Sequence, residues 1–439
     1  MRKFIKHHWA FILLFILLTI FLLQGINNIP FHPDESTYLY MSGDLDIYLR
    51  NPFRLSFHIQ EDDDPRQRYR LIDPPLTRYI LGISRKIVRT PTIENDWDWS
   101  KTWEENLKNQ AMPNKNLLST GRVALTIFLL LSIILIYIIG SYIGGRISGI
   151  AAAVFLGVNA LALLHGRRAM AEGILIFGIT LLLVSLIYST KLPWLTGVGM
   201  AIAINSKHST FLLFFVGLIA VSWFTEKTSN IRLKIIRNLS LYLGSFFLIT
   251  IVLNPVFWNQ PMKALQVALF ERQQLLTQQV EDMQLLMPDR VLDSLGKKTV
   301  AHIANLFILP PSVADVGNYI DNTKVSEEVY LSNPMNNLFR GPIGGGISMI
   351  LTLLGITLAS IQIPGLSPQK RKVPILFLLA TGIQICGLII FVPLPWQRYV
   401  IPLVPFVCIW AGYGLGCTIT LLSNTLSNLS FNQNRGTHY

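Results

Sequence analysis

Three short turns between apolar stretches of the sequence carry cationic side chains, whose natural ligand is a phosphate or diphosphate. Residues 165–172, 205–210 and 395–399 form these turns and supply His165, Arg167, Arg168, Glu172, Lys207, His208 and Arg398. A single positive residue at the end of an apolar run usually only reaches toward the membrane surface. Three such turns on one side of a membrane would instead form a surface for binding phosphate.

Two adjacent carboxylates, Asp34 and Glu35, follow the first apolar run of the chain. Neighbours in a helix or turn point in different directions, so one carboxylate can enter a site while the other pairs elsewhere. The same two residues also fit an ordinary helix start, because the helix dipole favours acidic residues in the first turn. The dipeptide alone leaves both interpretations open.

The sequence Asp73-Pro74-Pro75-Leu76 lies further along the same polar segment. A proline pair ends the preceding element and can begin a helix. Apolar residues then recur at helical spacing, which predicts an amphipathic surface helix. They are Leu76, Tyr79, Ile80, Ile83 and Ile87.

The composition shows what kind of protein must position these residues. Of 439 residues, 51% are hydrophobic and only 14% are charged, with a mean hydropathy of +0.45. A soluble domain carries about 25% charged residues, so soluble enzymes, disordered chains and small disulfide-rich modules are excluded. The net charge of +12 is explained by basic residues that flank apolar runs, with no need for a nucleic-acid partner. Cys386, Cys408 and Cys417 have no spacing typical of a zinc site.

Uncharged runs of membrane-spanning length predict an all-α polytopic membrane protein with about ten spans. The first run, residues 9–29, reads as a retained helix because no small-residue cleavage site follows it. The remaining runs are residues 123–143, 147–164, 173–190, 192–206, 209–225, 238–259, 342–364, 373–396 and 399–422.

The distribution of positive charge predicts which connections face the cytoplasm. With the N-terminus inside, residues 226–237 and 367–372 form basic cytoplasmic connections. Arg167 and Arg168 fall on the opposite side, against this rule, and therefore need another explanation. The spans themselves hold almost no ionisable residues, which argues against ion or proton transport.

Two long segments, residues 27–116 and 260–341, lie outside on this topology, within one membrane domain of residues 1–425. A polar tail, residues 426–439, follows it. Residues 263–287 have the periodicity of an amphipathic helix, with Leu265, Leu269, Leu276, Val280, Met283 and Met287 near one face. Such a helix can lie on the membrane surface or pack on the membrane domain.

The order of these features resembles the GT-C superfamily of integral-membrane glycosyltransferases, in particular its protein O-mannosyltransferase and aminoarabinose-transferase branch. Members of that branch resemble this chain in five successive features. These are the acidic pair Asp34-Glu35, the segment Pro74-Pro75-Leu76, an Arg-containing turn with an acidic residue (Arg167, Arg168 and Glu172), a turn with Lys207, and Arg398-Tyr399 followed by Pro402 and Pro405. The sequence departs from the pattern in having Glu172 where Asp is usual.

The resemblance implies a GT-C-like helical bundle that transfers a hexosyl or pentosyl group from a polyprenyl-phosphate or diphosphate carrier, with inversion. It implies that Asp34 acts as general base on an acceptor hydroxyl and that Glu35 orients it or binds a structural partner. Lys207, His208, Arg398, Arg167 and Arg168 would stabilise the leaving phosphate. No cofactor is implied with certainty, although Asp34 and Glu172 suit a divalent cation such as Mg²⁺ or Mn²⁺.

Two other classes stay open from the sequence. A lipid-linked saccharide flippase would share the cationic turns, and a non-catalytic membrane assembly subunit would tolerate loss of the outer carboxylates. We expect a bacterial plasma membrane protein with both termini in the cytoplasm and the site on the outer face. The partners expected are the lipid bilayer, a carrier-linked sugar and an acceptor hydroxyl that the sequence does not identify.

Overall fold

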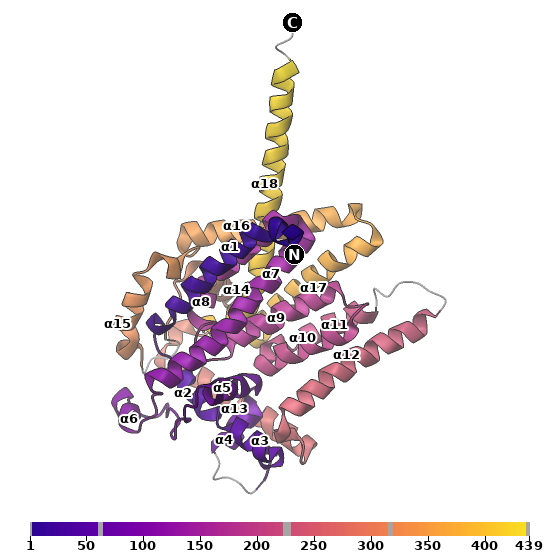
Figure 1. The fold of residues 1–439 in the computed structure, drawn as a ribbon. Helices are drawn as coiled ribbons and strands as arrows, with labels where there is room; N and C mark the ends of the chain where they lie inside the picture. The colour runs from indigo at the N-terminus through magenta and orange to yellow at the C-terminus, as the bar shows by residue number, and fades with distance from the viewer. Residues whose placement is uncertain (1, 60–64, 223–229, 315–318, 436–439) are drawn as a thin grey trace.

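The structure, a computed structural model, describes residues 2–59, 65–222, 230–314 and 319–435, with side chains from residue 8 to 423 of these ranges. Every regular element in these ranges is helical (Figure 1). The predicted all-α class is therefore confirmed. The predicted tail at 426–439 lies partly within the last helix, whose backbone continues to Arg435, and its last four residues lie outside the described ranges.

Five helices are long and apolar enough to cross a membrane: Lys115–Gly157, Ile231–Leu253, Gly341–Gly365, Pro368–Phe391 and Gln397–Ser423. Three shorter apolar helices accompany them: His8–Gln24, Glu172–Ile187 and Leu213–Ser222. The polytopic membrane class is confirmed by these helices. They are fewer than the ten predicted spans, partly because Lys115–Gly157 contains one complete predicted run and part of the next.

A single glycine divides that long helix, α7 (Lys115–Gly157), into two halves. Gly145 has a φ of +79°, a conformation that glycine adopts without steric cost. The halves fold back on each other so closely that a Cβ on Gly149 would lie 2.7 Å from the Tyr137 carbonyl oxygen. The predicted boundary between the runs 123–143 and 147–164 is therefore at this turn.

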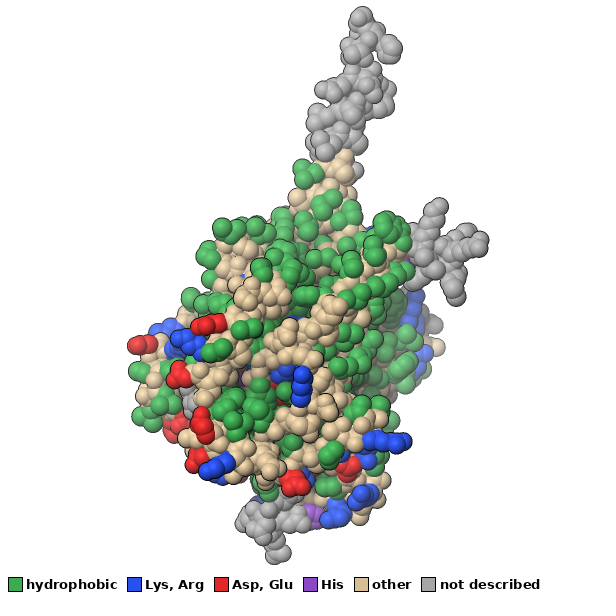
Figure 2. Space-filling model, turned by 60° about the vertical axis from the view of Figure 1, so that its left-hand side comes forward, with side chains coloured by type: hydrophobic (Ala, Val, Ile, Leu, Met, Phe, Trp, Pro, Cys, Tyr) green, Lys and Arg blue, Asp and Glu red, His purple; other side chains and the backbone are tan. Residues whose placement is uncertain are grey.

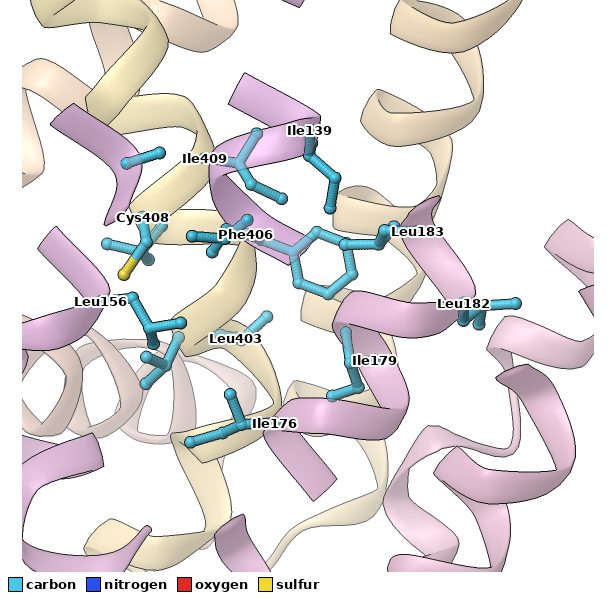
Figure 3. Packing of buried hydrophobic residues seen from close by; sticks show 14 of the residues in the cluster. Ile139, Leu156, Ile176, Ile179, Leu182, Leu183, Leu403, Phe406, Cys408 and Ile409 are labelled. Carbon is cyan, nitrogen blue, oxygen red and sulfur yellow. The ribbon is translucent and has the colours of Figure 1, made fainter. Parts of the chain in front are cut away.

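The centre of the bundle is formed by α7, α9 (Glu172–Ile187) and α18 (Val404–Arg435). Figure 3 shows their aliphatic and aromatic side chains interlocked, with Phe406 of α18 close to Ile179 and Leu183 of α9. Around this centre lie α1 (Arg2–Gln24), α10 (Pro193–Ser206), α11 (Leu213–Ser222), α12 (Ile231–Leu253), α16 (Gly341–Gln362) and α17 (Pro368–Phe391).

The outer helices of the bundle expose large apolar side chains on their outward faces. On α16 the opposite, buried face is a stripe of small residues, Gly345, Ser348, Thr352, Gly355 and Ala359. This stripe lets α16 approach α18 so closely that a Cβ on Gly355 would lie 2.0 Å from the Trp410 carbonyl oxygen. Figure 2 shows hydrophobic side chains over the upper and middle part of one face, whereas most charged side chains gather lower down.

The two long polar segments fold at one end of the bundle (Figure 1). The first forms α2 (Pro33–Met41), α3 (Asp44–Arg50), α4 (Pro65–Ile72), α5 (Leu76–Ile87) and α6 (Trp103–Lys108). The second forms α13 (Pro261–Leu286), α14 (Leu295–Ile303) and α15 (Ile320–Leu331). The predicted helices at 263–287 and after Pro75 are thus confirmed.

Helix α13 packs on α4, where Ala264 and Ala268 meet Leu71, and Arg68 Nε donates to Glu271 Oε2 over 2.9 Å. The small alanines form its buried stripe. Leu265 and Leu269, which we predicted on the apolar face, are exposed. Packing between the two outer segments therefore decides which face of this helix is buried.

Candidate functional site

A cavity of about 1070 Å³ is lined by α2, α4, α13 and the start of α9. The turn between α4 and α5, the turn after α10 and the segment after α17 complete its wall. Five residues predicted for the site line it, although they come from four separate places in the sequence. They are Asp34, Glu172, Lys207, His208 and Arg398. The tertiary structure therefore brings most of the predicted phosphate-binding and acidic residues into one space.

Asp34 stands in the first turn of α2, held there by local structure. Pro33 begins the helix, and the Asp34 amide donates to His32 Nδ1 over 3.0 Å. The Asp34 carboxylate forms an ion pair with Arg398, which lies in the 3₁₀ helix η10 (Gln397–Leu403). The Arg398 guanidinium lies 5.0 Å from the centre of the Trp396 ring. Asp34 thus reaches the cavity with an arginine already beside it.

Glu172 and Lys207 form a second charged pair in the cavity. Glu172 begins α9 and Lys207 follows α10, and Lys207 Nζ donates to Glu172 Oε1 over 2.8 Å. The other carboxylate oxygen, Oε2, is buried and has no hydrogen-bond partner among the described residues. A buried acceptor without a partner is costly, so this oxygen is available to a hydroxyl of a ligand.

Three further cavity residues were not among the predicted site residues: Tyr38, Asp73 and Arg272. Burial raises the pKa of Tyr38 well above its usual value, and the negative charges of Asp73, Glu172 and Asp34 act in the same direction. The three carboxylates therefore converge on Tyr38. In the sequence Asp73 stands out only as the residue before two prolines, and Arg272 is one of several charged residues on an amphipathic helix. Neither therefore had a sequence feature that marked it as a site residue.

His208 lines the cavity but differs from the other cationic candidates. The His208 side chain is exposed toward the cavity, and desolvation by the surrounding protein, with the positive charge of Arg272, lowers its pKa to about 4. The imidazole is therefore neutral near pH 7. In this form it can donate a hydrogen bond to a ligand.

Glu35 points away from the cavity into a closed network. It accepts from Arg122 Nε and Nη2 at 2.8 and 2.7 Å, from the Ala169 amide at 2.9 Å and from the His32 amide at 3.1 Å. Burial raises its pKa, but Arg122 outweighs this and, with Arg168 and the Ala169 amide, lowers the pKa below the usual value. The network is the structural partner that sequence reasoning allowed for Glu35.

Arg167 and Arg168 lie outside the residues that line the cavity. Arg167 Nε donates to the Leu163 carbonyl over 2.5 Å, and Arg168 donates to the carbonyls of Pro30 and Val313 over 3.2 and 3.0 Å. Both side chains are fully buried. Their exception to the charge rule is explained by backbone carbonyls that need donors, and the structure does not bring them to the predicted phosphate site.

The predicted divalent-cation pair, Asp34 and Glu172, fits a metal poorly. Each carboxylate is already neutralised by its own cation, Arg398 or Lys207. No group of three or more His, Cys, Asp or Glu side chains suited to a metal ion occurs within the part of the chain that the structure describes.

No known family model matches the sequence, and no curated protein matches it either. Several solved structures do match this chain, at low sequence identity. The Archaeoglobus fulgidus oligosaccharyltransferase AglB, in complex with an inhibitory peptide and a dolichol-phosphate, is 13% identical with a TM-score of 0.41, and the match covers 90% of this chain and 52% of that one. The same organism's oligosaccharyltransferase with Zn and sulfate is 12% identical with a TM-score of 0.48, covering 96% and 51%.

A third similar structure is ArnT from Cupriavidus metallidurans bound to undecaprenyl phosphate. It is 14% identical with a TM-score of 0.46, and the match covers 92% of this chain and 60% of ArnT. The chain thus spans between half and three fifths of the length of these proteins. AglB and ArnT are GT-C glycosyltransferases, the superfamily that the sequence motifs of this chain resemble.

Proposed function

We propose that the chain is a membrane glycosyltransferase of the GT-C type, which transfers a sugar from a polyprenyl-phosphate or diphosphate carrier to an acceptor hydroxyl. The observation that carries this proposal is the make-up of the cavity. It joins a cluster of cations and carboxylates to an apolar wall beside a helix long enough to span a membrane. A ligand that matches it has an anionic head group and a long apolar chain.

The polar part of the cavity suits the phosphate of such a carrier. Lys207, Arg398 and Arg272 line it from three different elements. Lys207 and Arg398 form ion pairs with Glu172 and Asp34, so an arriving phosphate competes with these carboxylates for them. Cations already fixed by such pairs need little reorganisation when a phosphate replaces a carboxylate.

The apolar wall suits the polyprenyl chain. It consists of Leu276, Met283 and Leu286 on α13 and of Phe391 and Val392 at the end of α17. Leu286 and Phe391 are 71% and 67% exposed, so a hydrocarbon chain can cover them. Covering them with a hydrocarbon chain contributes about 25 cal/mol per Å² of apolar surface removed from water.

In the proposed reaction the acceptor oxygen attacks the anomeric carbon from the face opposite the carrier. The new C–O bond forms as the bond from the anomeric carbon to the phosphate oxygen breaks, which inverts the configuration. The electron pair of the broken bond stays on the phosphate, where Lys207, Arg398 and Arg272 stabilise the added negative charge. The hydroxyl proton must pass to a base, and both Asp34 and Asp73 line the cavity.

We further propose that residues 1–425 act as one domain in a bacterial plasma membrane, with the cavity on the outer face. The basic connections at 226–237 and 367–372 support this orientation, because positive charge is retained on the cytoplasmic side. Residues 226–229 of the first connection lie outside the described ranges.

The proposal is tested with the purified full chain in lipid vesicles and a panel of undecaprenyl-phosphoryl hexoses and pentoses. Release of free undecaprenyl phosphate is measured, because every hydroxyl acceptor, water included, yields this product. We expect release with at least one sugar, and loss of release when both Lys207 and Arg398 are replaced by alanine. Absence of release together with absence of undecaprenyl phosphate binding would overturn the proposal. Sugar movement across vesicles without release would favour a flippase.

A further inference from the structure

Three of the carboxylates that line the cavity, Asp34, Asp73 and Glu172, differ in their partners. Asp34 is paired with Arg398, and Glu172 with Lys207. For Asp73, no hydrogen bond or ion pair links its carboxylate to any residue in the described ranges. Of the three, Asp73 is therefore the carboxylate whose oxygens are all open to a ligand.

The backbone at Asp73 is nevertheless firmly held, so that the side chain is presented at a fixed place. Its amide donates to the Tyr69 carbonyl over 2.9 Å, which closes the last turn of α4. Its carbonyl accepts from Arg78 Nη2 over 2.5 Å, and the same nitrogen donates to the Tyr69 carbonyl over 3.1 Å. Pro74 and Pro75 then fix the turn into α5.

Charged groups face Asp73 from each neighbouring element. Burial raises the pKa of Asp73 above its usual value, and the negative charge of Asp34 on α2 raises it further. The positive charges of Arg272 on α13, Arg78 on α5 and Arg398 on η10 lower the pKa but do not cancel the effect of burial. The result is a carboxylate that binds a proton more readily than an ordinary aspartate. Asp34, in contrast, is held in an ion pair with Arg398.

We propose that Asp73 takes the proton of the acceptor hydroxyl during transfer, and that Asp34 instead positions Arg398 for the leaving phosphate. This rests on the proposed function. In the step, the acceptor O–H bond breaks toward an Asp73 oxygen as the acceptor oxygen bonds to the anomeric carbon, and the carrier phosphate leaves with the electron pair. The proton on Asp73 then passes to water. A general base is most effective when its pKa is raised toward the working pH.

The test compares Asp73→Asn, Asp34→Asn and the exposed control Asp293→Asn in the carrier-release assay. Loss of a general base costs roughly 10²–10⁴-fold in turnover. We expect a loss of this size in kcat for Asp73→Asn with undecaprenyl phosphate binding retained. For Asp34→Asn we expect a smaller loss, seen mainly in KM. Asp293→Asn should match the wild type, because this carboxylate is exposed, does not line the cavity and pairs with Lys297.

The pH profile separates a proton acceptor from a structural residue. The wild type should lose kcat on acidification as Asp73 becomes protonated, Asp73→Asn should lack this limb, and Asp73→Glu should keep a limb with a changed midpoint. A kcat for Asp73→Asn within twofold of the wild type would overturn the inference and leave the proposed function intact. So would an unchanged acidic limb in that variant, or a collapse confined to Asp34→Asn. Absence of both release and carrier binding in the wild type would overturn the function itself.

Discussion

Asp34 and Glu35 are adjacent in the sequence, yet they belong to two regions with opposite character. Glu35 is on the buried side of α2, in a network where Arg122 and two backbone amides occupy its oxygens. Asp34 lies on the cavity side, 22% exposed, beside one arginine. Both carboxylates are paired with a guanidinium, so pairing alone does not distinguish a structural residue from a functional one.

The difference is in what a ligand can reach. The Glu35 network is sealed, and nothing can enter it without breaking several hydrogen bonds at once. The cavity keeps open positions: the unpartnered Oε2 of Glu172 and the free carboxylate of Asp73 among the described residues. Charged groups with unfilled positions beside a cavity are the ones that can exchange partners with a substrate.

The largest difference between the two regions is expected when the arginine is removed from each. Arg122→Ala leaves Glu35 charged, buried and unpaired, which we expect to lower the free energy of unfolding by about 3–5 kcal/mol. Arg398→Ala should cost far less, because Asp34 can meet water. Thermal unfolding of the two purified variants in detergent measures both effects. Equal losses would mean that the cavity pair is as structural as the buried one.

Ligand affinity tests the cavity region itself. A charge-assisted hydrogen bond contributes about 1.5–3 kcal/mol, so Lys207→Ala should weaken undecaprenyl phosphate binding by roughly 10–100-fold. Glu172→Gln should strengthen binding, since it removes the carboxylate that competes for Lys207. Binding is measured by titration of the purified protein, with the exposed Lys297→Ala as the control. Weaker binding in Glu172→Gln would show that Glu172 holds the ligand and does not compete with it.

The contribution of Glu35 to stability should depend on pH. Its pKa in the folded protein lies below the ordinary value of 4.5, so its stabilisation is complete above that value and is lost as pH falls through the lowered pKa. Compared with the wild type, Glu35→Gln should be less stable at pH 7 and should lose less stability on acidification. We expect this effect to be smaller than that of Arg122→Ala, because Gln keeps part of the hydrogen bonding. Melting temperatures from pH 7 to pH 3 measure it, and parallel curves would contradict it.

The smallest predicted effect concerns the contact between the two outer segments. Tyr319 and His32 share a buried hydrogen bond of 2.9 Å, next to the start of α2. Tyr319→Phe should cost about 0.5–1.5 kcal/mol in unfolding free energy, the net value of one such bond. Tyr188→Phe is the matched control, because Tyr188 is 41% exposed. Indistinguishable melting temperatures would mean that this bond does not link the segments.

Most of the helices and part of the site follow from the sequence alone. Apolar runs of spanning length and the periodicity of 263–287 predict the helices, because hydrophobic spacing is a local property. The presence of cations in three turns predicts an anion-binding surface, and Lys207 and Arg398 do line one cavity. Arg167 and Arg168 have the same sequence signal, but packing placed them beneath backbone carbonyls.

The tertiary structure alone decided which charges are partners. Asp34 and Arg398 are separated by 364 positions, and Glu172 and Lys207 by 35. Asp73 and Arg272 enter the cavity only because α13 packs across α4. A side chain's partner depends on which helices meet in space, and therefore on burial and shape complementarity summed over the whole bundle. The sequence determined which chemical groups this protein has and which segments carry them, and packing determined which of those groups a ligand can reach.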